Sequence, residues 1–310
     1  MSAAPAERTR RPLRGRSRRR WLVVLFLSPF FALTLLFFVA PAVITIGLAF
    51  TGLDMAFQGE FVGLANFRGS LADSLLPLVL LNTAVYVSCT AAFSLGLGLL
   101  LALLTTHVSE RAGRAFRALW LLPRLTPIVV YALLWLWVLD PTSYGLLNSL
   151  RAMLGLPPVD LISVSPRLVI VLVSGLIGAS LGMVILTSAI RSIPIDYIRA
   201  ARIDGASGWG VIRYVVLPLI RWPLTFVLVF QSLSLLTSYD DILLVTGGGP
   251  FYDSTVYALY IFRRAFQNGL YGYGAALAVV LVVGGAVAAS LSWRLLQFER
   301  MIAAPKIEAD

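Results

Sequence analysis

The sequence predicts an all-α, polytopic membrane protein with six spanning helices, and three observations lead to this fold class. The chain is 59% hydrophobic and only 13% charged over 310 residues, a composition typical of proteins with several membrane spans. Six long stretches contain no charged residue. Basic residues are distributed unequally between the segments that join these stretches.

A spanning helix needs about 20 mostly apolar residues, and four of the six stretches reach that length unaided. The third reaches it when residues 118–124 are included, with Arg124 inside the span, and the fifth when it begins at Pro218. The six stretches are Trp21–Leu53, Ser74–Thr106, Leu125–Leu139, Leu168–Ile190, Trp222–Tyr239 and Ala265–Trp293.

The basic residues predict the orientation, because cytoplasmic segments of membrane proteins carry an excess of Lys and Arg. With the N-terminus inside, nineteen basic residues fall in cytoplasmic segments and five in outer loops, while Arg124 lies at an interface. We therefore expect residues 1–20 to be a basic cytoplasmic tail, residues 21–300 a transmembrane domain and residues 301–310 a second cytoplasmic tail. The protein is expected to be a multi-pass protein of the inner (cytoplasmic) cell membrane.

Composition also excludes several classes of site. The basic excess is explained by topology and by attraction to anionic membrane lipid, so we expect no nucleic acid partner. The chain has one cysteine, Cys89, and one histidine, His107. These exclude a disulfide framework and a metal site built from His and Cys, so no metal is expected.

Two further patterns concern packing. Small residues recur at four-residue spacing, as in Ser94, Gly98 and Ala102 or in Gly178 and Gly182, and such spacing lets helix backbones approach closely in lipid. Apolar residues at helical spacing in Thr255–Phe266 predict a short helix lying along the outer surface.

A polar segment between the fourth and fifth stretches, residues 193–218, is longer than a turn requires. Pro194 and Asp196 suit the first turn of a helix, Ile195 and Ile198 lie on one face of it, and Asp204-Gly205 ends it. A second short helix then leads to Pro218. The segment is either a helix–turn–helix that docks on another protein or an interfacial connector that touches only lipid.

Ala200-Ala201, Asp204-Gly205-Ala206 and Leu217-Pro218 resemble the cytoplasmic coupling motif of binding-protein-dependent ABC importer permeases. Further matches, in family order over roughly residues 22–300, are similar to the carbohydrate-uptake branch of the maltose and glycerol-phosphate permease type. They are Gly63-Leu64-x-Asn66-Phe67, Asn82-Thr83, Phe116-Arg117 to Leu122-Pro123, Gly145-Leu146-Leu147-Asn148, Ile193-Pro194, Thr246-x-Gly248-Gly249-Pro250, Ala265-Phe266 and Gly272-Tyr273.

The resemblance implies a type I ABC importer permease fold, in which the Ile195–Ile203 helix seats in a groove of a cytoplasmic ATPase. It also implies four kinds of partner: a second homologous permease, two ATP-binding subunits, an extracellular solute-binding protein and a carbohydrate substrate. One position departs from the family, whose motif usually opens with Glu where this chain has Arg199. The hypothesis is therefore an acidic partner on the ATPase, or no ion pair at all.

We expect no ATP chemistry and no catalytic residue in this chain. A phosphate-binding loop needs Gly-Lys-Ser/Thr, and the only lysine is Lys306. ATP and Mg are accordingly expected on the partner ATPase, and this chain holds no cofactor.

The substrate path is predicted from a polar stripe in the fifth stretch. Gln231, Ser234 and Ser238, spaced i, i+3, i+7, share one helix face, and polar stripes in membrane helices face the bundle interior or a cavity. Ser174 and Gly178, one turn apart in the fourth stretch, are candidates to widen that cavity. Amide and hydroxyl groups suit sugar hydroxyls, although the same side chains can instead bond neighbouring helices.

Three charged residues are further candidates for the substrate path and its outer mouth. Arg124 lies between Pro123 and Pro127 and is either an interfacial side chain that reaches for water or a cavity residue. Asp240 and Asp241 are expected at the outer mouth, as a solvated helix end, a gate or a contact with a binding protein.

The leading functional hypothesis is a transport permease, and two alternatives remain open. A secondary transporter of a small polar solute would normally show acidic or basic residues within its spans, and Asp and Glu are absent from all six stretches. A membrane enzyme would need an acid–base, nucleophile or metal constellation, which the pattern does not contain.

Overall fold

The computed structural model describes residues 15–295, and the side chains of residues 24–292 and 294. This part of the chain is almost entirely helical, with no strand and a single antiparallel bridge between Thr51 and Phe61. The predicted tails 1–20 and 301–310 lie largely outside the described residues, although a helix already begins at Gly15.

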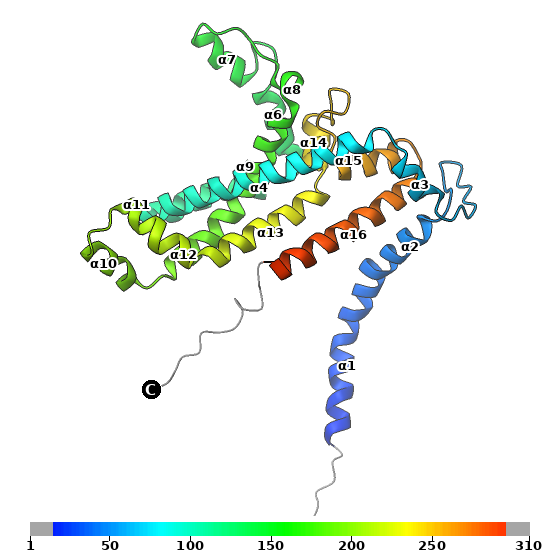
Figure 1. Ribbon diagram of the computed structural model, residues 1–310, viewed down its shortest axis with the longest axis horizontal. Coiled ribbons are helices and arrows are strands. Elements are labelled where there is room, and N and C mark those ends of the chain that lie inside the picture. The colour runs from blue at the N-terminus through cyan, green and yellow to red at the C-terminus, as the bar shows by residue number, and fades with distance from the viewer. Residues whose placement is uncertain (1–14, 296–310) are drawn as a thin grey trace, which may run out of the picture.

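The bundle is built on long helices that run side by side (Figure 1). Four helices are long and apolar enough to span a membrane singly, and two bent pairs bring the total to the six predicted spans when each pair is one span. The long elements are α1 with η1 and α2 (Gly15–Thr34, Leu35–Val39 and Ala40–Leu48), α4 (Leu76–His107), α9 (Pro166–Arg191), α13 (Arg221–Thr237) and α16 (Tyr271–Leu295).

Span three is broken by a 98° bend between α5 (Glu110–Leu125) and α6 (Ile128–Val138). Pro127 pushes the residue before it out of the helical region, and Thr126 accordingly has an extended ψ of 135°. Pro127 therefore ends α5 and produces an elbow in this span, whereas Pro123 lies inside the helix.

Span five is bent by 67° between residues 208–219 and α13. The segment before the bend contains α11 (Gly208–Val211), the π-helical η2 (Ile212–Val216) and α12 (Leu217–Leu219). The uninterrupted helix of this span therefore begins at Arg221, three residues after Pro218, because Ile220, with φ −95° and ψ 11°, interrupts the helix.

Short helices occupy the connections. In chain order they are α3 (Ala65–Leu71), α7 (Leu146–Met153), α8 (Leu161–Val164), α10 (Ile195–Ile203), α14 (Asp240–Val245), α15 (Tyr257–Phe262) and the π-helical η3 (Arg263–Gln267). Figure 1 places α10 and α11 at one end of the bundle, and α3, α14 and α15 toward the other.

The prediction that Thr255–Phe266 forms a helix lying along the outer surface is half wrong. The helix forms as α15, but Tyr257, Leu259 and Tyr260 are at most 3% exposed. Side chains of α4 make this burial possible by satisfying its backbone: Asn82 Nδ2 donates to the carbonyls of Tyr252 and Thr255, and the Tyr257 amide donates to Thr83 Oγ1 at 2.8 Å. The segment is consequently part of the core.

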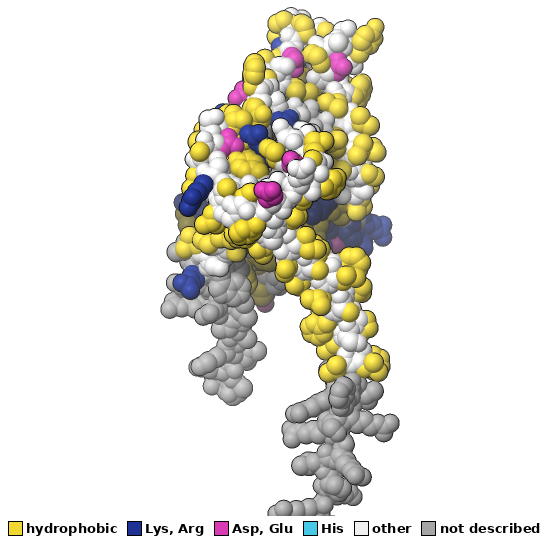
Figure 2. All heavy atoms as spheres, turned by 90° about the vertical axis from the view of Figure 1, so that its right-hand side faces the viewer, with side chains coloured by type: hydrophobic (Ala, Val, Ile, Leu, Met, Phe, Trp, Pro, Cys, Tyr) yellow, Lys and Arg dark blue, Asp and Glu magenta, His cyan; other side chains and the backbone are white. Residues whose placement is uncertain are grey.

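The N-terminal helix stands away from the bundle in both overall views, as a column of apolar side chains (Figures 1 and 2). None of the residues in its candidate span, Val24–Leu48, is buried in this chain. Contact with the rest is made at its end, where Ala49 packs against Ala275 and Ala276 of α16. Its large apolar surface faces lipid or another subunit.

The closest helix packing joins α4 to α9 at the predicted small-residue spacing. A Cβ added at Gly98 would lie 2.9 Å from the Ala179 carbonyl oxygen and 3.0 Å from the Met183 amide nitrogen. Both are backbone atoms, which no side-chain rotation can move. At Gly182 the added Cβ would meet only ordinary contacts, at 3.6 Å or more.

Replacing Gly98 by alanine should therefore force α4 and α9 apart and destabilise the protein by about 1–3 kcal/mol, the typical cost of overpacking. Gly96→Ala, two residues away on the same helix, is the matched control because its added Cβ meets nothing within 4 Å. Thermal unfolding of both variants in detergent measures the difference. Equal melting temperatures for the two variants would contradict the close approach.

Candidate functional site

A cavity of about 290 Å³ opens in the middle of the bundle and brings all the predicted path residues together. Its wall combines α9, α13, the start of α14 and the elbow of α5 and α6. The predicted residues that line it are Arg124, Ser174, Gly178, Gln231, Ser234, Ser238, Asp240 and Asp241. The sequence placed them on separate elements, and the fold places them around one space.

Asp241 is not the solvated helix end that was one of its predicted interpretations, since it is only 6% exposed. The chain leaves α13 at Ser238, where ψ is 132°, and turns Asp241 inward. Ser174 Oγ donates a hydrogen bond to Asp241 Oδ2, and Ser238 Oγ donates to Oδ1 at 3.4 Å. Asp240, by contrast, is exposed.

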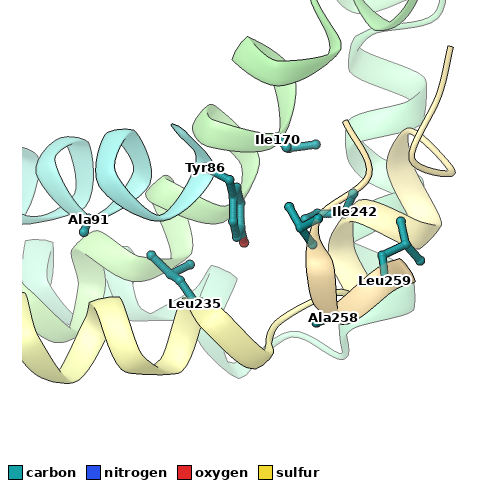
Figure 3. Packing of buried hydrophobic residues seen from close by; sticks show 8 residues of the cluster. Tyr86, Ala91, Ile170, Leu235, Ile242, Ala258 and Leu259 are labelled. Atoms are coloured by element: carbon teal, nitrogen blue, oxygen red, sulfur yellow. The ribbon is translucent and has the colours of Figure 1, made fainter. Parts of the chain in front are cut away.

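Tyr86 of α4 belongs to this cluster and was missed in the sequence. Its hydroxyl donates to Ser174 Oγ at 3.0 Å, and the residue is 1% exposed. Figure 3 shows the ring reaching from α4 toward Leu235 and Ile242, next to the turn that carries Asp241. No periodicity in residues 74–106 distinguished this tyrosine, because its role depends on a residue 88 positions away.

Gln231 is 7% exposed, and its Oε1 is buried with no hydrogen-bond partner among the described residues. Its amide nitrogen lies against Gly178, where an added Cβ would overlap it at 1.9 Å. A buried acceptor without a donor is costly. The side chains of Ser174, Gln231 and Asp241 nevertheless line the cavity with hydroxyl, amide and carboxylate groups, which suit a ligand rich in O–H groups.

Arg124 lies in the last turn of α5, where a cation complements the helix dipole. Its side chain is exposed and lines the cavity. Of its two predicted interpretations, the structure thus agrees with the cavity residue, which here lies at a helix end.

The segment 193–218 lies at the far end of the bundle from α3 (Figure 1). Helix α10 spans Ile195–Ile203, as predicted, and ends in a Schellman motif: the Gly205 amide donates to the Arg202 carbonyl and the Ala206 amide to the Ala201 carbonyl. Gly205 has φ +83°, a conformation that favours glycine. The small residues of the motif thus form a tight helix end.

One face of this segment packs on the bundle and the other is open. Ile198, Ala201 and Ala206 pack against a cluster that includes Leu186 and Ile190 of α9, which joins the segment to span four. Large apolar side chains remain exposed on the other side, namely Ile195, Tyr197, Ile203, Trp209 and Tyr214. Leu217 also packs in this cluster and Pro218 is exposed.

Arg199 is exposed and pairs with Asp196 of the same helix at 3.3 Å. Of its neighbours in the motif, Ala200 and Asp204 are also exposed. Surface pairs of this kind contribute little free energy, so the Arg199 guanidinium is available to another protein.

These features define a class: a helical membrane permease with a polar cavity and an exposed helical segment at one end of the bundle. Residues 94–297 match the model of the family described as "binding-protein-dependent transport system inner membrane component". The chain belongs to this family, and it is a permease subunit of an ABC transporter in the inner membrane.

Relatives and solved structures agree with this assignment. The chain is 33% identical to a probable ABC transporter permease protein of Pyrococcus horikoshii, over 84% of this chain and 90% of that protein. It is 30% identical to the alpha-glucoside transport system permease protein AglF of Rhizobium meliloti, over 86% and 78%. A bacterial alginate ABC transporter, solved with an alginate pentasaccharide-bound periplasmic protein, contains a chain with a TM-score of 0.78 and 25% identity, over 91% of this chain and 96% of that one.

Gly178→Ala should push the Gln231 amide into the cavity, because the new methyl group would occupy its position. Uptake by the assembled transporter should fall severalfold, with an increase in the substrate concentration needed for half-maximal rate. Gly182→Ala, one turn along α9, is the control because its Cβ meets only ordinary contacts. Equal uptake by the two variants would show that the Gly178 site does not limit the cavity.

Proposed function

We propose that the chain is one of two homologous permease subunits of an ATP-driven importer that carries a carbohydrate across the inner membrane by alternating access. The solute is supplied by an extracellular solute-binding protein, and two separate ATP-binding subunits bind ATP and Mg. Both termini of the chain are cytoplasmic in this proposal, as the distribution of arginine favours.

The cavity is the observation that carries the proposed substrate class. Its polar groups are an amide, three serine hydroxyls, one guanidinium and two carboxylates. Hydroxyl and amide groups form hydrogen bonds with sugar hydroxyls and leave no charge behind in the membrane. The alpha-glucoside permease and the alginate transporter among the similar proteins support the same class.

The proposed coupling element is α10 with the segment that follows it. Its exposed apolar side chains lie at the end of the bundle farthest from α3. Its inner face packs on α9. Because α9 also carries Ser174 and Gly178 of the cavity wall, a force applied at α10 is transmitted along one helix to the cavity. An ATPase that closes against this surface would thereby rock spans four and five.

Reconstitution tests the proposal most directly. The chain is assembled in vesicles with the partner permease, ATPase and binding protein, and uptake of the saccharide that the binding protein retains is followed with and without internal ATP. The proposal expects uptake only with ATP and binding protein. Uptake without the ATPase would favour a secondary transporter instead.

Gln231→Leu removes the orphan acceptor while keeping a side chain of similar size. A net hydrogen bond between neutral groups contributes about 0.5–1.5 kcal/mol, so uptake at low substrate concentration should fall about three- to tenfold. Ser232→Ala, the neighbouring residue, which does not line the cavity, should leave uptake unchanged. An unaffected Gln231→Leu transporter would remove this side chain from the substrate path.

Arg199→Glu should reduce ATP-driven uptake and the ATPase activity that substrate-loaded binding protein stimulates, because it reverses the charge facing the proposed acidic partner. A complementary acidic-to-basic change on the ATPase should restore both. Arg221→Glu, at an exposed arginine that begins α13 and lies outside the proposed coupling element, is the matched control. Unchanged transport after Arg199→Glu alone would show that no ion pair forms at this position.

A further inference from the structure

Three arginine side chains surround a single carboxylate at the start of α5. Glu110 Oε1 lies 2.8 Å from Arg191 Nη1, 3.6 Å from Arg114 Nε and 3.9 Å from Arg117 Nη2. The short contact goes to Arg191, so Arg114 is held only loosely. Arg111, one residue after Glu110, makes no hydrogen bond or ion pair within residues 15–295.

The two weakly paired arginines share the open face of α5. Arg111, Arg114, Ala118, Leu122 and Leu125 follow one another at spacings of three and four, which places them on one side of a helix. All five are exposed. The opposite side packs tightly on α4, since a Cβ at Gly113 would lie 2.5 Å from the Thr105 carbonyl oxygen.

The open face carries two arginines at one end and apolar side chains from Ala118 to Leu125 along the rest of its length. Arg114 and Leu125 are eleven residues apart, or about 16 Å along a helix at 1.5 Å per residue. Half of the hydrocarbon core of a bilayer is about 15 Å thick. A guanidinium at the headgroup level therefore places Leu125 at the depth where acyl chains end.

At the Leu125 end of this face, the elbow of span three forms an apolar hollow. A cavity of about 270 Å³ lies there, lined by residues that include Leu122, Pro123, Leu134 and Trp135. The 98° bend between α5 and α6 creates this hollow. It is lined from both α5 and α6 and shares no lining residue with the polar cavity.

We propose that the open face of α5 binds one anionic phospholipid, with its phosphate between Arg111 and Arg114 and an acyl chain along Ala118 and Leu122 into the elbow. Charge complementarity selects this occupant, because three guanidinium groups share the Glu110 carboxylate, the Arg111 guanidinium has no partner within residues 15–295, and a phosphodiester supplies the missing charge. The apolar body below the arginines distinguishes a phospholipid from a soluble phosphate. The site would hold the elbow of span three, which lines the substrate cavity on its other side through Arg124 and Ile128.

Native mass spectrometry of the assembled transporter tests this, with dioleoylphosphatidylglycerol and dioleoylphosphatidylcholine added separately. The wild-type transporter should retain phosphatidylglycerol in preference to phosphatidylcholine. R111Q/R114Q should bind phosphatidylglycerol about thirtyfold more weakly, equivalent to about 1 kcal/mol per arginine. R213Q/R221Q, which removes two exposed arginines at the same end of the bundle, is the matched control and should change binding less than twofold.

Further arms separate the lipid from other occupants. Glycerol phosphate at millimolar concentration should not displace the lipid, and L122N should weaken phosphatidylglycerol without losing the preference over phosphatidylcholine. Displacement by glycerol phosphate would show an anion site without a lipid and overturn the proposal. So would equal retention of both lipids, equal losses in the two double variants, or absence of any retained lipid, which would mean that a partner subunit covers the face.

Discussion

The close contact of α4 with α9 is the constraint on which the other elements depend. Without an aqueous phase to drive helices together, association in a membrane relies on close packing of small residues. Gly98 brings the two backbones so near that a methyl group cannot fit. The cavity wall on α9, Tyr86 on α4 and the cluster that supports α10 all take their positions from this pair.

Breaks in the helices produce the functional features of the chain. The elbow of span three exposes backbone that only protein or a cavity can accommodate at membrane depth, and the structure places a polar cavity on one side and an apolar hollow on the other. The bend before α13 separates the docking segment from the span that carries Gln231. The unwound turn at Ser238 directs Asp241 into the bundle.

One helix connects the two ends of the proposed mechanism. α9 carries Ser174 and Gly178 at the cavity and, about 18 Å beyond Gly178 along the helix, Ile190 in the cluster against which α10 packs. A rigid helix transmits a displacement along its length, because its hydrogen-bonded backbone moves as a unit. In the proposed mechanism, α9 thus links sugar recognition to ATPase docking without any residue common to both.

The sequence by itself determined the elements that depend on local periodicity and composition: the spans, the ends of α10, the breaks at Pro127 and Gly205, and the polar stripe on α13. Helical spacing and backbone preferences are properties of neighbouring residues, and a single chain displays them. Spacing and family resemblance led us to expect Gln231 and Ser174 at one cavity, and the bundle brings them together there.

Only the tertiary structure decided the burial of Asp241 and of α15. Both depend on partners far along the chain, Ser174 for the carboxylate and Asn82 with Thr83 for the helix. A buried polar group requires a donor or acceptor in the right place, and no pattern within residues 240–266 contains that information. The elbow angle and the unpaired charge of Arg111 are likewise results of packing. Glu110 makes its short contact with Arg191, which is 81 positions away in the chain.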